Sequence, residues 1–213
     1  MTAASGITEP AQLRGRKVAI SSPTGSSTIQ TQYVLSKLYG MDTRLQGGDI
    51  TFQPTAPEAL VSVLNNGGVD AATNLNKPRY LLEHTQGYGP LVHVSQDVHK
   101  ALGAYPVTTV LATYPEVERD RSADLTKLTT ALRTSVDYAR SDKQELAGKV
   151  DGANPGDVDY LNWWWSTTDP KYGSLTQQDV AGIKAFWTMA NAVGQLADVP
   201  TFDTLRSAAA PTQ

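Results

Sequence analysis

The sequence predicts an α/β fold with a mainly parallel sheet, followed by a helical C-terminal region. Over residues 17–73, short apolar segments that suit buried strands alternate with stretches of helical periodicity, in the order β-α-β-α-β. After Pro115 the pattern changes, and apolar residues recur only at helical spacing. We therefore expect a three-layer α/β lobe with a five-stranded, mainly parallel sheet, and then a group of C-terminal helices.

The first strand and the turn after it form the most informative part of the chain. Val18–Ile20 has the pattern of a buried strand, and a turn rich in small hydroxyl residues follows it. Ser27 and Gln30 match a capping box, in which a hydroxyl at the cap position is followed three residues later by Gln. The helix is expected to run to Tyr39 and to end at Gly40.

The remaining elements follow from the same two periodicities. Short or alternating apolar runs predict further strands over Asp49–Gln53, Val69–Thr73, Leu91–Ser95 and Val107–Thr113. Pro57 and Pro78 suit the first positions of two helices between these strands. Three apolar series predict the C-terminal helices: Leu125, Leu128, Leu132 and Val136; Val158, Leu161 and Trp165; and Val180, Ile183, Trp187, Ala190 and Val193.

Composition excludes several classes of function. A hydrophobic content of 40% and a charged content of 18% are ordinary for a globular protein, and a net charge of −3 gives no basic face for nucleic acid. No apolar run approaches the ~20 residues of a membrane helix, and the first eleven residues lack the pattern of a signal peptide. Because the chain has no cysteine, disulfides, thiolate metal sites and cysteine nucleophiles are excluded.

Several segments, in their order along the chain, resemble one known family. Leu13–Ile20 resembles a "DLKGKKIAV" segment, Pro23–Ser27 a "GST"-like turn, Glu58–Ala71 an "A…AL..G.VDA" segment, Val107–Thr113 a return crossover, and Leu175–Val180 with Gly194–Leu205 the C-terminal segment. The family is that of the solute-binding proteins of ABC transporters, of the nitrate, sulfonate, taurine and thiamine-precursor type. The resemblance extends over residues 13–205, and the order of the segments carries it.

The resemblance implies a two-lobed fold of the periplasmic-binding-protein type with a small-molecule ligand in the cleft. It implies an ABC permease as partner and a periplasmic or extracytoplasmic location for the full-length form. Family members carry a further N-terminal segment, so we expect this chain to be the C-terminal portion of such a protein or a shortened variant. The expected division is a lead-in over residues 1–15, an α/β ligand-binding lobe over 16–106, a crossover strand with C-terminal helices over 107–206, and a flexible tail over 207–213. Apolar helix faces left uncovered would allow a homo-oligomer.

The turn after the first strand is the first candidate ligand site. The candidate residues are Thr24, Gly25, Ser26, Ser27 and Thr28. A helix start exposes backbone N–H groups at the positive end of the helix dipole, which suits an anionic or polar head group. The alternative is that the hydroxyls only cap the helix, as the Ser27/Gln30 pair would do. Both interpretations remain open at the level of sequence.

Two further residues are candidates for ligand contact. Asn74 follows the third strand, where ligands of open α/β sheets bind, whereas Asn76 and Lys77 suit a helix cap and a polar loop. Trp164 lies in a run of three tryptophans, which point about 100° apart on a helix and so cannot all face one core. The alternative is that two of them pack in the core and one lies on the surface. Asp70 is expected to hold backbone near its strand.

No catalytic, metal-binding or cofactor-binding constellation is evident in the sequence. The three histidines are not spaced for a metal site, no Gly-x-Ser-x-Gly elbow is present, and no lysine follows the turn as a nucleotide loop requires. The sequence therefore favours a binding protein that delivers a small organic anion or nitrogen compound to a transporter. The alternatives are an enzyme on the same fold, like the thiamine-pyrimidine synthases or the desulfinases, or an interaction module without a ligand.

Overall fold

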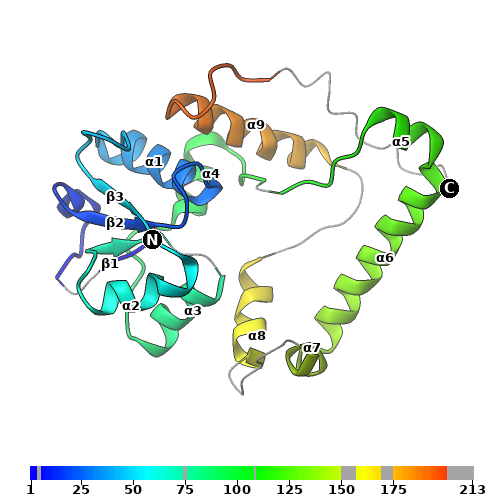
Figure 1. Cartoon of the computed structure of the whole chain (residues 1–213), viewed down its shortest axis with the longest axis horizontal. Helices are drawn as coiled ribbons and strands as arrows, with labels where there is room; N and C mark the ends of the chain where they lie inside the picture. The colour runs from blue at the N-terminus through cyan, green and yellow to red at the C-terminus, as the bar shows by residue number, and fades with distance from the viewer. Residues whose placement is uncertain (4–5, 74–75, 108, 150–156, 169–174, 201–213) are drawn as a thin grey trace. The chain divides into compact units, whose positions relative to one another are not determined.

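The computed structural model describes residues 1–3, 6–73, 76–107, 109–149, 157–168 and 175–200. The described chain forms two compact units, which are treated separately below (Figure 1). The first unit comprises the described residues up to 107 together with 176–200. The second unit comprises the described residues from 109 to 175.

The first unit contains a sheet of four strands in the order β1-β4-β2-β3. The strands are β1 (Thr2–Ala3), β2 (Lys17–Ile20), β3 (Thr51–Pro54) and β4 (Ala71–Ala72). The central strand β2 pairs in parallel with β3 and β4, and β1 pairs antiparallel with β4. The α/β class and the parallel pairing are therefore confirmed, but within the described residues the sheet does not have the five strands expected from the sequence.

Helices cover both faces of this sheet. One face places Val18, Ile20 and Phe52 in a core with α1 (Ser26–Tyr39), α4 (Val94–Leu102) and α9 (Gln177–Ala192). The other face places Ala19 and Ala72 in a second core with α2 (Leu60–Asn65) and α3 (Asn76–Thr85). Two short 3-10 turns, η1 (Pro10–Leu13) and η2 (Pro57–Ala59), precede β2 and α2. Alternate residues of β2 thus point to opposite cores, as the geometry of a strand requires.

The strand expected over Leu91–Ser95 is wrong, because α4 begins at Val94. Val94, Val98 and Leu102 recur at helical spacing, and Val98 is fully buried in the core beside α1. The run that suggested a strand was too short to separate the two periods. Leu91 instead donates its backbone N–H to the carbonyl oxygen of Met1 over 2.8 Å, without forming a strand.

The strand expected over Val107–Thr113 is also wrong for the residues that the structure describes, 107 and 109–113. The Val107 N–H donates to the carbonyl oxygen of Gly182 in α9 over 3.3 Å, so the chain here meets a helix rather than a sheet edge. Val110 and Leu111 are 44% and 65% exposed. A strand needs a neighbouring strand for its backbone groups, and the residues of this segment from Thr109 onward belong to the second unit rather than to the unit that holds the sheet.

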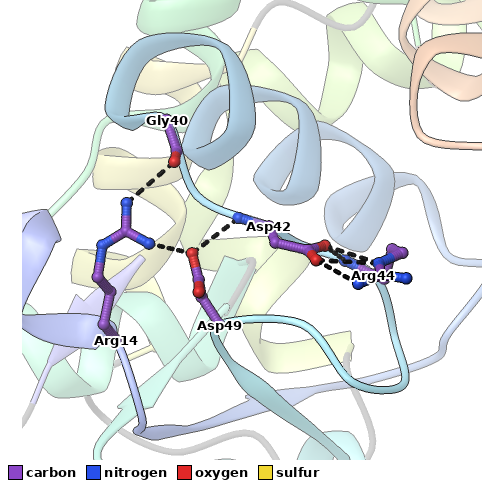
Figure 2. Close-up of polar contacts among 5 residues, drawn as sticks. All are labelled: Arg14, Gly40, Asp42, Arg44 and Asp49. Atoms are coloured by element: carbon purple, nitrogen blue, oxygen red, sulfur yellow. Dashed lines mark hydrogen bonds and ion pairs between the residues drawn. The ribbon is translucent and has the colours of Figure 1, made fainter.

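A polar network holds the loop between α1 and β3 (Figure 2). Arg14 pairs with Asp49 and donates to the carbonyl oxygen of Gly40 over 2.9 Å, and Gly40 ends α1 with a φ of 60°. The Asp42 N–H donates to Asp49 Oδ2 over 2.9 Å, and Arg44 forms an ion pair with Asp42 at 2.6 Å. Hydrogen bonds from Arg44 lower the pKa of Asp42. This network lies where β2 and β3 begin, at the amino end of the sheet.

Asp70 has the structural role that the sequence predicted. Its Oδ2 accepts the Lys17 N–H over 2.9 Å, and its Oδ1 accepts from Arg16 over 3.3 Å. We expect Asp70→Ala to lower the free energy of unfolding by about 1 kcal/mol, because the partly exposed carboxylate joins the starts of β2 and β4. Asp70→Asn, which keeps an oxygen acceptor, should lose less than half of that. Urea unfolding of the two variants measures the difference, and equal losses would contradict the backbone role.

The second unit consists of helices α5 (Pro115–Asp120), α6 (Ser122–Ser141), α7 (Lys143–Lys149) and α8 (Asp157–Thr167). The predicted helices around Leu125 and Val158 are confirmed as α6 and α8. No residue of α6 is fully buried, and Leu128 is 52% exposed. The apolar residues of α6 are therefore largely uncovered. Within the described part of the chain, no helix is long and apolar enough to cross a membrane.

Candidate functional site

The candidate site lies at the carboxyl end of the parallel strands in the first unit. β2 and β3 end together, with Ile20 beside Pro54, and β4 pairs with β2 as far as Ala72. The first residues after β3 and β4 continue the ladder, since Thr55 donates to Ile20 over 2.8 Å and Thr73 donates to Ala19 over 2.9 Å. Ligands of open α/β sheets bind at this edge. We call the turn 21–25 and the first turn of α1, Ser26–Thr28, the seat.

The helix of the seat begins two residues earlier than the sequence predicts. α1 starts at Ser26, and Gly25 is the N-cap, with φ −71° and ψ 149° and no side chain that could cap the helix. The predicted capping box of Ser27 and Gln30 is therefore wrong. Ser27 is the second helical residue, so its hydroxyl is no longer at the position from which a cap is made.

Hydrogen bonds within the seat fix its turn. The Ser22 carbonyl oxygen accepts the Gly25 N–H over 3.2 Å and the Thr28 hydroxyl over 2.7 Å. The hydroxyls of Ser22 and Thr24 lie 3.5 Å apart. Thr28 is fully buried, so its hydroxyl holds the turn from inside. The sequence did not distinguish this role from ligand contact.

The backbone N–H groups of Ser26, Ser27 and Thr28 have no hydrogen-bond partner among the described residues. A helix start leaves these N–H groups unpaired unless a side chain, water or a ligand accepts from them. They also carry the positive end of the dipole of a 14-residue helix. Thr24 is exposed, and Gly25 and Ser26 are half-buried, so the seat is open to solvent on one side. The seat can therefore accept an anionic oxygen through backbone donors.

A second row of hydroxyl groups adjoins the seat, and the sequence analysis missed it. Thr31 of α1 lies 3.2 Å from Thr73, hydroxyl to hydroxyl, and both side chains are buried. This contact brings the second turn of α1 to the end of β4. The sequence does carry a signal for these residues, because Thr55 and Thr73 each follow directly after a parallel strand.

The seat also contacts a residue from the far end of the chain. Gln195, which follows α9, donates from Nε2 to the carbonyl oxygen of Pro23 over 3.4 Å. Nothing in the spacing of the sequence relates position 195 to position 23.

The two other predicted ligand contacts are Asn74 and Trp164. Asn74 lies outside the described residues. Trp164 belongs to α8 in the second unit, where its ring meets that of Trp165 edge to face at 4.7 Å. All three tryptophans of the run are half-buried, and the Arg140 guanidinium lies 5.1 Å from the Trp165 ring centre. Their role in ligand contact stays a prediction.

An open hollow of about 810 Å³ occurs elsewhere in the first unit, lined by Gly6–Thr8, Asn65 and Gln86–Leu91. Asn65 ends α2, the helix that leads into β4, so the hollow lies toward the amino end of that strand. The seat is at the carboxyl end. The hollow is therefore separate from the candidate site.

Comparisons with known proteins bear on the fold. No protein-family model matches the chain, and no curated protein matches its sequence. The crystal structure of the periplasmic aliphatic sulphonate binding protein SsuA from Escherichia coli is similar to this chain, with a TM-score of 0.69 and 15% sequence identity. The similarity covers 93% of this chain and 61% of that protein, so the chain spans less than two thirds of its length. The chain thus shares the fold of an ABC-type solute-binding protein.

Proposed function

We propose that this chain binds a small organic anion, such as a sulfonate or carboxylate, or a small nitrogen compound, and that it does so without catalysing a reaction. The observation that carries the proposal is the uncapped start of α1, where the N–H groups of Ser26, Ser27 and Thr28 lack partners in the described structure. The site lies at the sheet edge where this class of fold binds ligands.

The transport role belongs to the same proposal. A solute-binding protein of an ABC transporter works outside the cytoplasm and hands its ligand to a membrane permease. The fold shared with a periplasmic sulfonate-binding protein supports this role. The resemblance of Leu13–Ile20 and of the turn Pro23–Ser27 to the nitrate, sulfonate and taurine type supports it independently.

The proposal is tested by thermal unfolding in the presence of candidate ligands. The panel contains ethanesulfonate, taurine, nitrate, benzoate and a thiamine-pyrimidine precursor, each against an equal concentration of sodium chloride. A ligand at 100 times its Kd adds ~2.7 kcal/mol, which raises the Tm of a chain of this size by roughly 5–11 °C. Ethanol serves as the uncharged control for ethanesulfonate and should give no shift. If none of the panel raises the Tm at 10 mM, the chain is not a competent receptor for these anions.

A further inference from the structure

We infer that Gln195 is a positioning residue of the seat, which holds the peptide group between Pro23 and Thr24 in one orientation. The inference rests on the proposed function, since it concerns how the ligand-binding turn is kept in shape. Its basis is the contact from Gln195 Nε2 to the Pro23 carbonyl oxygen, at 3.4 Å across 172 residues of sequence.

The backbone that carries Gln195 is held firmly. After α9, Gly194 adopts a φ of 74°, and the N–H groups of Gln195 and Leu196 donate to the Ala190 carbonyl oxygen over 2.8 and 3.2 Å. The Asn191 side chain donates to the carbonyl oxygens of Leu196 and Ala197, each over 3.0 Å. Leu196 packs against the core beneath α1. The chain reversal thus places Gln195 at a defined point beside the seat.

The side chain of Gln195 acts on the seat through peptide geometry. All described peptide bonds are trans, so the carbonyl of Pro23 and the N–H of Thr24 point in opposite directions. A donor that holds the Pro23 carbonyl therefore also fixes the direction of the Thr24 N–H, which has no partner among the described residues. Without Gln195 no hydrogen bond among the described residues holds this peptide group itself, and the turn loses part of its preorganisation for a ligand.

The first arm of the test needs no ligand. In ¹⁵N-labelled protein, Gln195→Ala and Gln195→Glu should both move the amide resonances of Thr24 and Gly25. The Glu variant matters because it keeps the size of Gln but offers no N–H donor at pH 7. Gln195→Lys, which restores a donor, should return both resonances toward their wild-type positions. Gln178→Ala, a change of the same type at an exposed position in the first turn of α9, should leave both unmoved.

The second arm measures binding with ethanesulfonate as the probe. We expect Gln195→Ala and Gln195→Glu to weaken binding about three- to tenfold with little change in Tm, as for the loss of one neutral hydrogen bond. Unmoved Thr24 and Gly25 resonances in both variants would overturn the inference. If the resonances move but the wild-type protein does not bind the probe, the positioning role stands and the proposed ligand class fails. Moved resonances with unchanged affinity would show that the peptide orientation does not serve this ligand.

Discussion

Ser26→Pro is expected to weaken anion binding roughly 10- to 100-fold while leaving the fold intact. The substitution removes the Ser26 N–H, and a charge-assisted hydrogen bond of this kind is worth about 1.5–3 kcal/mol. Proline is well tolerated at the first helical position, where the missing N–H has no partner within the helix. Gly25, with φ −71° and ψ 149°, already has the extended conformation that a residue before proline requires.

The control for this prediction is Ser26→Ala, which removes the hydroxyl and keeps the N–H. Its affinity for the anion should fall less than that of Ser26→Pro, and the Tm values of both should stay near that of the wild type. Isothermal titration with the anion that gives the largest thermal shift measures the affinities. If Ser26→Pro binds as tightly as the wild type with an unchanged Tm, the backbone donors of the seat do not hold the ligand.

Gly182→Ala is expected to destabilise the first unit by about 2 kcal/mol or more. A Cβ at this position in α9 would lie 2.4 Å from the Tyr105 carbonyl oxygen and 2.9 Å from Val107 Cγ2. Both are far below an ordinary contact, and the first is backbone, so α9 and the segment Tyr105–Val107 would have to move apart. The hydrogen bond from the Val107 N–H to the Gly182 carbonyl oxygen would be lost with that movement.

Gly148→Ala provides a matched control, because it makes the same change in another helix. Nothing lies within 4 Å of a Cβ at Gly148 in α7, and alanine favours helix over glycine by about 0.5–1 kcal/mol. The two substitutions should therefore change stability in opposite directions. Urea unfolding followed by circular dichroism measures both, and a Gly182→Ala protein as stable as the wild type would show that the two segments are not in contact.

Much of the first unit could be predicted from the sequence because its strands and helices have strong local signals. Val18–Ile20 and the end of α1 at Gly40 were placed correctly, since a buried apolar run and a glycine stop are local features. The strand prediction for Leu91–Ser95 was wrong because so short a run cannot distinguish the strand period of 2 from the helix period of 3.6. The strand prediction from Val107 was wrong because a strand forms only beside another strand, and no local pattern shows whether that neighbour is present.

The candidate site was likewise predicted only in part. The sequence located the turn between β2 and α1, but it misplaced the cap by two residues, since the N-cap is Gly25 and not Ser27. That shift decides in favour of open backbone donors over a self-capped helix. Thr73 and Gln195 were missed because their relation to the seat comes from strand register and from the packing of α9, not from spacing.

The sequence by itself determined the alternation of strands and helices, the parallel class of the sheet and the position of the seat turn. These features depend on local hydrophobic periods and on turn residues, which each segment carries within itself. Only the tertiary structure decided that α9 packs against α1, that the Gly182 carbonyl oxygen accepts the Val107 N–H, and that Gln195 reaches Pro23. Those contacts join residues up to 172 positions apart, and they form only when the whole unit has closed around its core.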